Sequence, residues 1–380
     1  MKIFSWNLFI AGVLSLVVFS SIFLLLQNAF VYENTLGKFS SNYTRIENGA
    51  EYEIRKVKKA YEKINEQKLK TWDADIYSCI SKNLYEKDAG CYTKVKGAFF
   101  PLFPLVWKFS GLNSIGISIL NYILFIVSIG ILVSLILKGT SHHKLLTFCI
   151  LISLPSTIIY YIPYTEALFL FTMTFALLGH IRNKYSLYFI ACMAMAMLRP
   201  ATLFILLAIL SLEFIGFVFL RNAGQFIKNV SKRTLPFLVG FVVAILIQYA
   251  SSDSFLTMLD AQKYWYGNLG FFQTISDWSI EGFGLNTFSV FFIAIPSFFI
   301  LIYLLTRGDI FKRVLTDEIV EKENAISYFA IVSVFYLAGI LIFILMTSGG
   351  NLHSFFRFTM ASPAFYIALL FLLNSIDKNK

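Results

Sequence analysis

Long runs of apolar residues recur along the whole chain, and they limit its possible folds more than any other feature. One run extends from Ile115 to Leu137 and contains no charged side chain. Because a helix of about 20 apolar residues spans the hydrocarbon core of a bilayer, each such run predicts a transmembrane helix. The composition agrees, with 57% hydrophobic residues, only 14% charged residues and a mean hydropathy of +0.70. We therefore predict an all-α polytopic membrane protein, with residues 1–380 forming a single integral membrane domain.

About ten segments have the apolar character expected of membrane spans, although some are short. They cover residues 7–27, 115–137, 145–162, 167–181, 186–198, 201–220, 234–250, 286–305, 326–347 and 358–375. The first segment is long for a signal peptide, so we expect it to be retained. Basic residues are concentrated in the loops between alternate segments, which marks those loops as cytoplasmic. Both termini are then cytoplasmic, and the long loops at 28–97 and 251–285 are external.

Several functional classes are disfavoured. The formal net charge of +10 does not indicate nucleic-acid binding, because the basic residues lie mostly in short loops between apolar segments. The sequence has no P-loop, no GxSxG motif and no Cys/His spacing typical of a metal site. Cys149 and Cys192 fall inside apolar segments and are expected to be packing residues. Cys79 and Cys91 share the first long loop, and the sequence leaves open whether they form a disulfide.

Chemically reactive side chains gather at residues 71–108, where the first long loop meets the next apolar segment. Asp73 and Asp75 are flanked there by Trp72 and Tyr77. An aromatic run broken by two prolines follows: Phe99-Phe100-Pro101-Leu102-Phe103-Pro104-Leu105. Carboxylates beside aromatic rings are typical of an active site at the membrane surface, because the rings seat an amphipathic ligand at the headgroup level. The residues alone do not distinguish Asp73 from Asp75 as the reactive acid.

The predicted topology places further charged residues on the same external face. Glu166, Arg199 and Arg357 each stand at the external end of an apolar segment. A single charge at such a position usually just reaches into water. Charges from four separate loops instead suit a phosphate-bearing lipid, whose head is held by arginines while a carboxylate deprotonates a hydroxyl. On the same face, Trp265 is a candidate for lining a lipid or sugar groove, and His353 for a polar contact with the ligand.

Other ionisable residues fall on the opposite, cytoplasmic side. Glu213 lies inside an apolar segment, about two helical turns from Arg221, and we expect it to form a structural ion pair there. His142, His143 and His180 stand at cytoplasmic ends of their segments, which argues against a role in the external site.

Five parts of the sequence match, in order, the motifs of a known family. Trp72-Asp73-Ala74, followed by Tyr77 and Ile80, resembles the W-D-A-x-x-(F/Y)-x-x-I motif of the PIG-V-type mannosyltransferases, members of the GT-C glycosyltransferase group. The run from Ala98 to Leu105 is similar to that family's A-F-F-P-x-(F/Y)-P-L. The other matches are Pro155 with Tyr164-Thr165-Glu166-Ala167-Leu168-Phe169, then Arg199, and finally Arg357 with Pro363. Two positions depart from the family pattern: Leu84-Tyr85 replaces Gly-Tyr, and Arg199-Pro200 replaces Arg-x-Gly.

The resemblance implies a GT-C-like bundle of about 10 transmembrane helices with a long first external loop, in the inner membrane of a bacterium. It implies an inverting transfer of a hexose, with mannose the first candidate, from a polyprenyl- or dolichyl-phosphate donor to a lipid-linked or cell-surface glycan. Asp73 takes the position of the family's catalytic acid. Donor phosphate and sugar contacts fall on Arg199, Arg357, Glu166 and Tyr164. Acceptor or supporting contacts fall on Trp72, Asp75, Tyr77, Phe99, Phe100, Trp265 and His353.

We expect neither a cofactor nor a metal, because Asp73 and Asp75 alone are few ligands and a lipid-phosphate donor has no diphosphate to hold. The main alternative is a non-enzymatic transporter or flippase of lipids or glycolipids. That class requires charges along a path through the middle of the bilayer, and the sequence offers almost none. A membrane assembly scaffold is the third class, and its function would survive Asp73→Asn.

Overall fold

The computed structural model describes residues 2–26, 45–47, 50–52, 69–70, 73–86, 95–252, 258, 261, 283–307, 314, 322–347, 352 and 355–377. The N-terminal half contains α1 (Lys2–Leu26), α5 (Asp73–Asn83), the 3₁₀ segment η2 (Lys96–Ala98), α6 (Leu102–Ser110), α7 (Ser114–Ile136), α8 (Ser141–Ile152) and the 3₁₀ segment η3 (Pro155–Tyr161). The C-terminal half contains α9 (Glu166–Ile181), α10 (Tyr185–Ala196), α11 (Thr202–Leu220), α12 (Ala223–Ser252), α14 (Phe283–Phe288), the π-helical segment η4 (Ser289–Ala294), α15 (Ile295–Leu305), α17 (Lys322–Thr347), α18 (Phe355–Phe358) and α19 (Pro363–Asp377). Among the described residues, one short hairpin, β1 (Arg45–Glu47) with β2 (Ala50–Tyr52), departs from the all-α prediction.

Five of the described helices are long and apolar enough to cross a membrane: α7, α11, α12, α17 and the continuous segment Leu285–Leu305. Shorter apolar helices are Ile10–Ile22 within α1, α9, α10 and Pro363–Ser375 within α19. The chain is therefore a multi-pass α-helical membrane protein. The count of about ten spans remains a prediction, because the shorter helices reach the required length of about 20 residues only if the bilayer thins or neighbouring residues contribute.

The segment expected as one span at 145–162 is broken. Helices α8 and η3 meet at a bend of 72°. Pro155 stands at the start of η3, and proline disfavours a helical conformation in the residue before it while removing a backbone donor. The break leaves residues 162–165 outside a regular helix before α9 begins.

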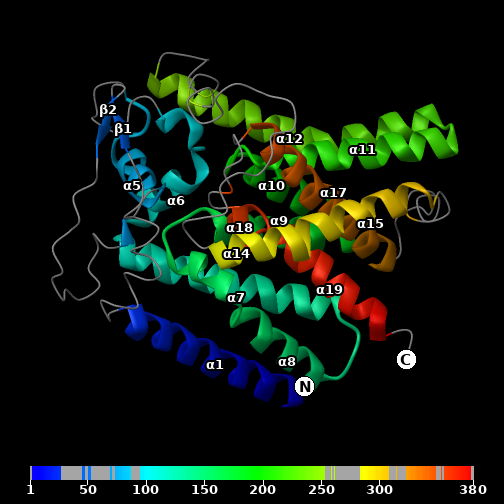
Figure 1. Cartoon of the computed structure of the whole chain (residues 1–380), viewed down its shortest axis with the longest axis horizontal. Coiled ribbons are helices and arrows are strands. Elements are labelled where there is room, and N and C mark those ends of the chain that lie inside the picture. Colours follow the sequence, from blue (N-terminus) through cyan, green and yellow to red (C-terminus); the bar gives the residue numbers. More distant parts are fainter. Residues whose placement is uncertain are drawn as a thin grey trace.

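Figure 1 shows α1, α7 and α8 along one side of the molecule and α10, α11 and α12 along the opposite side, with α9, α17 and α19 between them. Helix α9 contacts α7, α10 and α17, and α17 contacts α11, α15 and α19. Helices α5 and α6 and the β hairpin lie at the end of the bundle opposite the first residues of α1 and the last residues of α19. Which end is cytoplasmic remains a prediction.

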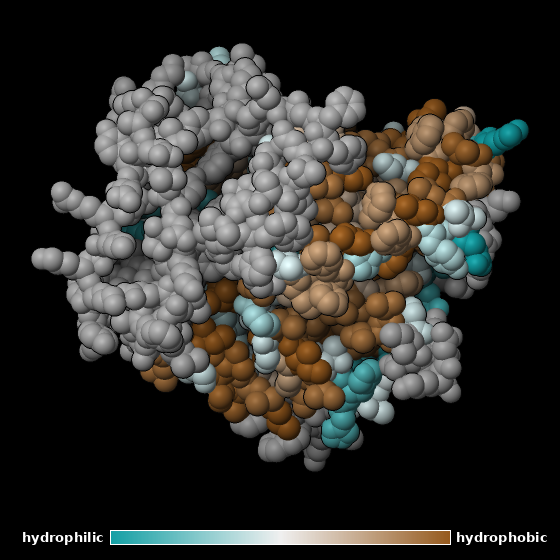
Figure 2. Space-filling view, in the orientation of Figure 1, coloured by the Kyte–Doolittle hydropathy of each residue, from teal (hydrophilic) through white to brown (hydrophobic). Residues whose placement is uncertain are grey.

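The outer surface of the helices is apolar. Exposed leucine, isoleucine, valine and phenylalanine side chains include Leu203, Leu207, Phe214, Leu235, Leu238, Val242, Leu246, Phe291, Phe292 and Phe299. Figure 2 shows hydrophobic residues over much of the described surface on that face, with the most hydrophilic residues toward its right-hand and lower edges. A contiguous exposed apolar surface of this kind is what a helical bundle presents to lipid.

Small residues let neighbouring helices approach closely. A Cβ atom at Gly179 of α9 would lie 2.6 Å from the backbone nitrogen of Tyr188 in α10. Gly240 of α12 likewise leaves no room for a Cβ against the Met193 carbonyl of α10. Helices in membranes associate through such close packing because lipid offers no hydrophobic driving force between them. The result is a tight α9–α10–α12 layer behind the site.

Cys149 and Cys192 are free thiols, in agreement with their expected packing role, and Cys192 is buried. Cys79 is disulfide-bonded. Cys91, the fourth cysteine of the sequence, lies outside the described residues.

Candidate functional site

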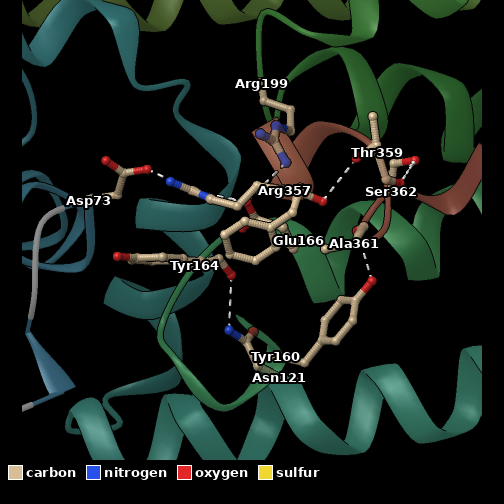
Figure 3. A network of polar contacts seen from close by, with 11 residues as sticks. Asp73, Asn121, Tyr160, Tyr164, Glu166, Arg199, Arg357, Thr359, Ala361 and Ser362 are labelled. Atoms are coloured by element: carbon tan, nitrogen blue, oxygen red, sulfur yellow. Dashed lines mark hydrogen bonds and ion pairs between the residues drawn. The ribbon is translucent and has the colours of Figure 1, made fainter. Parts of the chain in front are cut away.

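Four charged side chains from separate parts of the chain meet in one place, and we call Asp73, Glu166, Arg199 and Arg357 the charged cluster. Arg357 Nη2 lies 2.8 Å from Asp73 Oδ2 and 2.8 Å from Glu166 Oε1. Arg357 Nε also donates a hydrogen bond of 2.9 Å to Glu166 Oε1, and Arg199 Nη1 lies 3.2 Å from that same oxygen. Figure 3 shows Arg357 extending toward Asp73, with Arg199 approaching Glu166 from above. The structure therefore brings together residues that are up to 284 positions apart.

The charged cluster is neutral in sum and shielded from solvent to different degrees. Glu166 is fully buried, the side chains of Arg199 and Arg357 are each 10% exposed, and that of Asp73 is 22% exposed. An unpaired charge at such depth would cost several kcal/mol, so the two arginines and two carboxylates stabilise one another. Glu166 Oε1 takes all the contacts, whereas Glu166 Oε2 is buried without a hydrogen-bond partner among the described residues. Asp73 is the member most open to an incoming ligand.

Glu166 is placed by the break between η3 and α9. It is the first residue of α9, where a negative charge faces the positive end of the helix dipole. The preceding irregular backbone is held by α7: Asn121 Nδ2 donates to the carbonyl oxygens of Ile162 at 2.8 Å and Tyr164 at 2.9 Å, and Ser118 donates to that of Tyr161. These contacts give side-chain donors to carbonyl groups at or beyond the end of η3, and the Ile162 carbonyl also accepts a hydrogen bond from the Tyr164 amide. They fix the entry into α9.

Arg357 is held in α18 by contacts on two sides of its guanidinium. Its Cζ lies 4.4 Å from the centre of the Tyr164 ring, a cation–π contact, while Glu166 fixes the edge of the group. Burial alone would lower the pKa of Arg357, but the carboxylates of Glu166 and Asp73 raise it well above its ordinary value. The turn after α18 is anchored by Tyr160, whose hydroxyl donates to the Ala361 carbonyl at 2.8 Å, as Figure 3 shows. Arg357 is therefore a permanent, oriented cation.

Arg199 enters from the turn between α10 and α11. Its guanidinium lies near two aromatic rings, 5.6 Å from the centre of Phe169 and 5.3 Å from that of Phe358. The turn is closed by Thr202, whose hydroxyl donates to the Met195 carbonyl at 2.8 Å. Because these rings and Glu166 surround the guanidinium, Arg199 too has a defined direction, toward the same point as Arg357.

Asp73 is carried by α5, a short helix that packs on the aromatic run. The Tyr77 ring meets Phe99 and Phe103 edge to face, with ring centres 5.1 Å apart in both cases. Asp73 stands in the first turn of α5, where the helix dipole favours a carboxylate. The aromatic run thus holds the helix that presents the acid.

Tyr77 also adjoins the charged cluster through its hydroxyl. Burial raises the pKa of Tyr77 above its ordinary value and the nearby carboxylate of Asp73 raises it further, while Arg199 and the neighbouring Thr165 side chain oppose the shift. Tyr77 therefore remains a neutral phenol beside Asp73 and next to the residue that precedes Glu166.

The remaining predicted site residues are distributed as follows. Asp75 is half-buried on α5, while Phe99 and Phe100 are buried at 7% and 1% exposure. Phe100 packs with Met197, Ala244 and the Phe241 ring, so both phenylalanines serve packing in the described structure, and a groove-lining role for them remains a prediction. Predicted residues outside the described part of the chain are Trp72, Trp265 and His353.

Asn121 is the positioning residue that the sequence reasoning missed. It is buried in α7 at 1% exposure, as one polar residue inside the apolar run 115–137. An amide inside a predicted span is itself a signal, because a buried polar group in the membrane needs a partner.

A second buried charged pair lies away from the charged cluster. Glu213 pairs with Arg233 of α12, and Tyr328 donates to the same carboxylate oxygen at 3.0 Å. The Arg233 guanidinium also lies 4.0 Å from the centre of the Tyr328 ring. The structural pair expected for Glu213 exists, but its partner is not the neighbouring Arg221, which is exposed at the C-terminal end of α11 with a φ of 51°.

Within the described part of the chain, no group of three or more His, Cys, Asp and Glu side chains is arranged to hold a metal ion. Whether a metal takes part thus remains a prediction. Comparisons with known proteins give no relative: no protein-family model, curated protein or solved structure matches this chain. The function is therefore argued from the site.

Proposed function

We propose that this protein is a membrane glycosyltransferase that moves a hexose from a lipid-phosphate donor to a hydroxyl of a glycolipid or glycan. The observation that carries the proposal is the meeting of Asp73, Glu166, Arg199 and Arg357 in one half-open cluster. The sequence motifs had marked each of these residues separately, and a purely structural role would not require all four to converge.

The two arginines suit the donor phosphate. Guanidinium groups bind phosphate through parallel hydrogen bonds, and here both groups approach one point from different elements. In the transfer, the bond between the sugar anomeric carbon and the phosphate oxygen breaks, and its electron pair leaves with the lipid phosphate. Arg199 and Arg357 stabilise that developing negative charge, which is the role in which oriented cations contribute most to catalysis.

Asp73 suits the general base. It takes the proton from the acceptor hydroxyl, whose oxygen then attacks the anomeric carbon from the side opposite the phosphate, so the configuration inverts. Such a base must come within about 2.6–3.2 Å of the hydroxyl that it deprotonates. Among the members of the charged cluster, Asp73 has the most exposed side chain, at 22%.

Glu166 and Tyr164 suit the binding of the sugar. Glu166 Oε2 is an acceptor without a described partner, and a sugar hydroxyl is the donor that a hexose would supply. The Tyr164 ring, already in contact with Arg357, offers a flat face beside the same region. On this assignment Glu166 both orients the arginines and contacts the substrate.

A transporter or flippase of glycolipids is the alternative, and the buried Glu213–Arg233 pair is the observation in its favour, because it places charge deep in the helical bundle. The pair and Tyr328 satisfy one another, however, which fits a structural clamp better than a substrate path.

The experiment measures transfer of radiolabelled mannose from polyprenyl-phosphate mannose in membranes that contain wild-type protein, Asp73→Asn or Asp75→Asn at matched expression. Loss of a catalytic base lowers the rate by about 10²–10⁴, so we expect that drop for Asp73→Asn and a smaller effect for Asp75→Asn. Equal rates for wild type and Asp73→Asn would move the base elsewhere. No transfer by any of the three proteins, tested with glucose and galactose donors as well, would favour the transporter.

A further inference from the structure

Asp73 already has a partner in the structure. Its Oδ2 accepts a hydrogen bond of 2.8 Å from Arg357 Nη2. This contact fixes the direction of the carboxylate, although its other oxygen keeps free lone pairs. If Asp73 is the base, release from Arg357 lets the carboxylate turn toward a substrate hydroxyl.

The two carboxylates hold Arg357 with different strength. Glu166 is fully buried and contacts Arg357 through both Nε and Nη2, and Arg199 holds the same oxygen from another side. Asp73 makes a single contact, its side chain is 22% exposed, and the first turn of α5 stabilises its negative charge independently of the arginine. Asp73 is therefore the partner that Arg357 can most easily exchange.

Charge balance decides when the exchange occurs. With two arginines and two carboxylates the charged cluster is neutral, so a phosphate seated on Arg357 and Arg199 would add a third anion. Like charges at close range repel, and the excess anion displaces whichever carboxylate is most exposed and least tied. That carboxylate is Asp73.

Resting on the proposed function, we infer that Arg357 masks Asp73 until the phosphate of a lipid ligand replaces it, so that the base is released only when the donor is bound. The arginine then serves two purposes in turn. Without ligand it holds the carboxylate in one direction, and with ligand it holds the leaving group. A hydroxyl-bearing molecule that arrives first meets a carboxylate fixed on the arginine, which limits hydrolysis and misdirected transfer.

The inference makes an unusual prediction about affinity. Because Asp73 competes with phosphate for Arg357, Asp73→Asn should bind a phosphate lipid more tightly than wild type, although it loses turnover. We expect a gain of roughly two- to fivefold, the upper part of the range for a partly exposed ion pair. Asp75→Asn removes the same charge from the same helix without removing the contact with Arg357, so its gain should be smaller.

The test is equilibrium binding of radiolabelled farnesyl phosphate to the purified full-length protein in detergent, with farnesol and inorganic phosphate as competitors. Binding to Asp73→Asn that is equal to or weaker than binding to Asp75→Asn overturns the inference, as does absence of farnesyl phosphate binding to wild type. Competition by inorganic phosphate, and none by farnesol, would assign recognition to the phosphate. Competition by farnesol and none by inorganic phosphate would assign recognition to the isoprenoid chain of the ligand. That result would contradict the replacement of Asp73 by phosphate on Arg357.

A second measurement uses the wild-type protein alone and so does not depend on how a variant folds. Carbodiimide-activated amine labelling of Asp73, read by peptide mass spectrometry, should rise several-fold on addition of farnesyl phosphate. Unchanged or reduced labelling contradicts the release of Asp73. The two proposals can be distinguished. Sugar transfer by wild type, without tighter binding of farnesyl phosphate by Asp73→Asn, contradicts only the masking of Asp73. Tighter binding by Asp73→Asn, without sugar transfer by wild type, contradicts only the proposed transferase activity.

Discussion

Glu166 and Arg357, 191 residues apart in the chain, are joined through two guanidinium nitrogens at 2.8 and 2.9 Å on a single carboxylate oxygen. This arrangement fixes the plane of the guanidinium as well as its position, so Nη2 faces Asp73 on the other side. The orientation of Arg357 is therefore set from within the bundle by Glu166, while the ligand-facing partner comes from the loop that carries Asp73. The direction in which Arg357 presents its N–H groups to Asp73, or to a ligand, therefore depends on Glu166.

The first prediction concerns Glu166→Gln. The amide keeps the shape of the side chain but leaves two buried arginines facing one carboxylate, which costs on the order of 3–5 kcal/mol. We expect a lower unfolding temperature of the detergent-purified protein and loss of transfer by at least about 100-fold, because the arginines lose their orientation. Near-normal stability together with near-normal transfer would show that Glu166 does not organise the charged cluster.

The second prediction concerns Arg357→Lys. Lysine keeps the charge but cannot join Asp73 and Glu166 through a planar fork, so it should not present a donor in the right direction. We expect a marked rise in KM for the lipid-phosphate donor together with a lower kcat. Initial rates at varied donor concentration provide the measurement, and Lys108→Arg, outside the charged cluster, is the control for expression. An Arg357→Lys enzyme with unchanged KM would remove this arginine from phosphate binding.

Much of this site was predictable from the sequence because membrane topology restricts where residues can lie. Glu166, Arg199 and Arg357 were expected at the same end of the bundle as Asp73 from the alternation of apolar segments alone, and the structure brings these four together. What alternation does not give is which side chain pairs with which, since contacts depend on the rotation of each helix about its axis.

Two particular residues illustrate that limit. Glu213 was expected to pair near Arg221, its neighbour along the chain, but it faces α12 and pairs with Arg233. The sequence predicts no role for Asn121, because the hydropathy of residues 145–162 indicates one continuous span and does not reveal the break at Pro155 that precedes its carbonyl partners. Both depend on where a helix turns or breaks, and hydropathy is insensitive to both.

The third prediction concerns Tyr77 and pH. Because burial and the nearby Asp73 raise its pKa above the ordinary tyrosine value, Tyr77 stays protonated throughout the range in which the protein works. In the unfolded chain Tyr77 loses its proton near pH ~10, whereas in the folded state it does so only at higher pH. The free energy of unfolding is therefore unaffected by Tyr77 below about pH 10 and decreases above it. Between about pH 6 and 9, the pH–rate profile of Tyr77→Phe should have the same shape as that of wild type.

Tyr77→Ala provides the contrasting variant, since it also removes the ring that packs on Phe99 and Phe103. Loss of a buried aromatic ring costs about 3–5 kcal/mol, so α5 should detach and transfer should fall even at optimal pH. A pH–rate profile that changes shape in Tyr77→Phe would instead make the phenol an acid or base of the reaction.

The fourth prediction concerns Asn121, which should matter although it lies away from the ligand. Asn121→Leu removes the amide donor from the buried carbonyls of Ile162 and Tyr164, although the Ile162 carbonyl still accepts from the backbone amide of Tyr164. Loss of such a buried donor costs about 1–3 kcal/mol. We expect a lower unfolding temperature and reduced kcat with little change in KM, because the displaced segment carries Glu166. Asn121→Gln keeps an amide donor and should recover part of the loss. An unfolding temperature and a kcat equal to those of wild type in Asn121→Leu would place Asn121 outside this role.

The last prediction separates the second buried pair from catalysis. Glu213→Gln leaves the Arg233 charge uncompensated next to Tyr328, and a broken buried pair typically costs about 3–5 kcal/mol. The double variant Glu213→Leu with Arg233→Met removes both charges, and apolar replacement of a whole buried pair is often neutral, so it should regain most of the lost stability. Because this pair lies away from the charged cluster, the double variant should retain KM for the donor and most of the turnover of wild type. Unfolding temperature and transfer rate, measured on the same preparations, decide the matter. If the stable double variant still fails to act on the lipid-phosphate donor, then Glu213 and Arg233 belong to a substrate path, and the transporter alternative gains the support that the charged cluster alone does not give it.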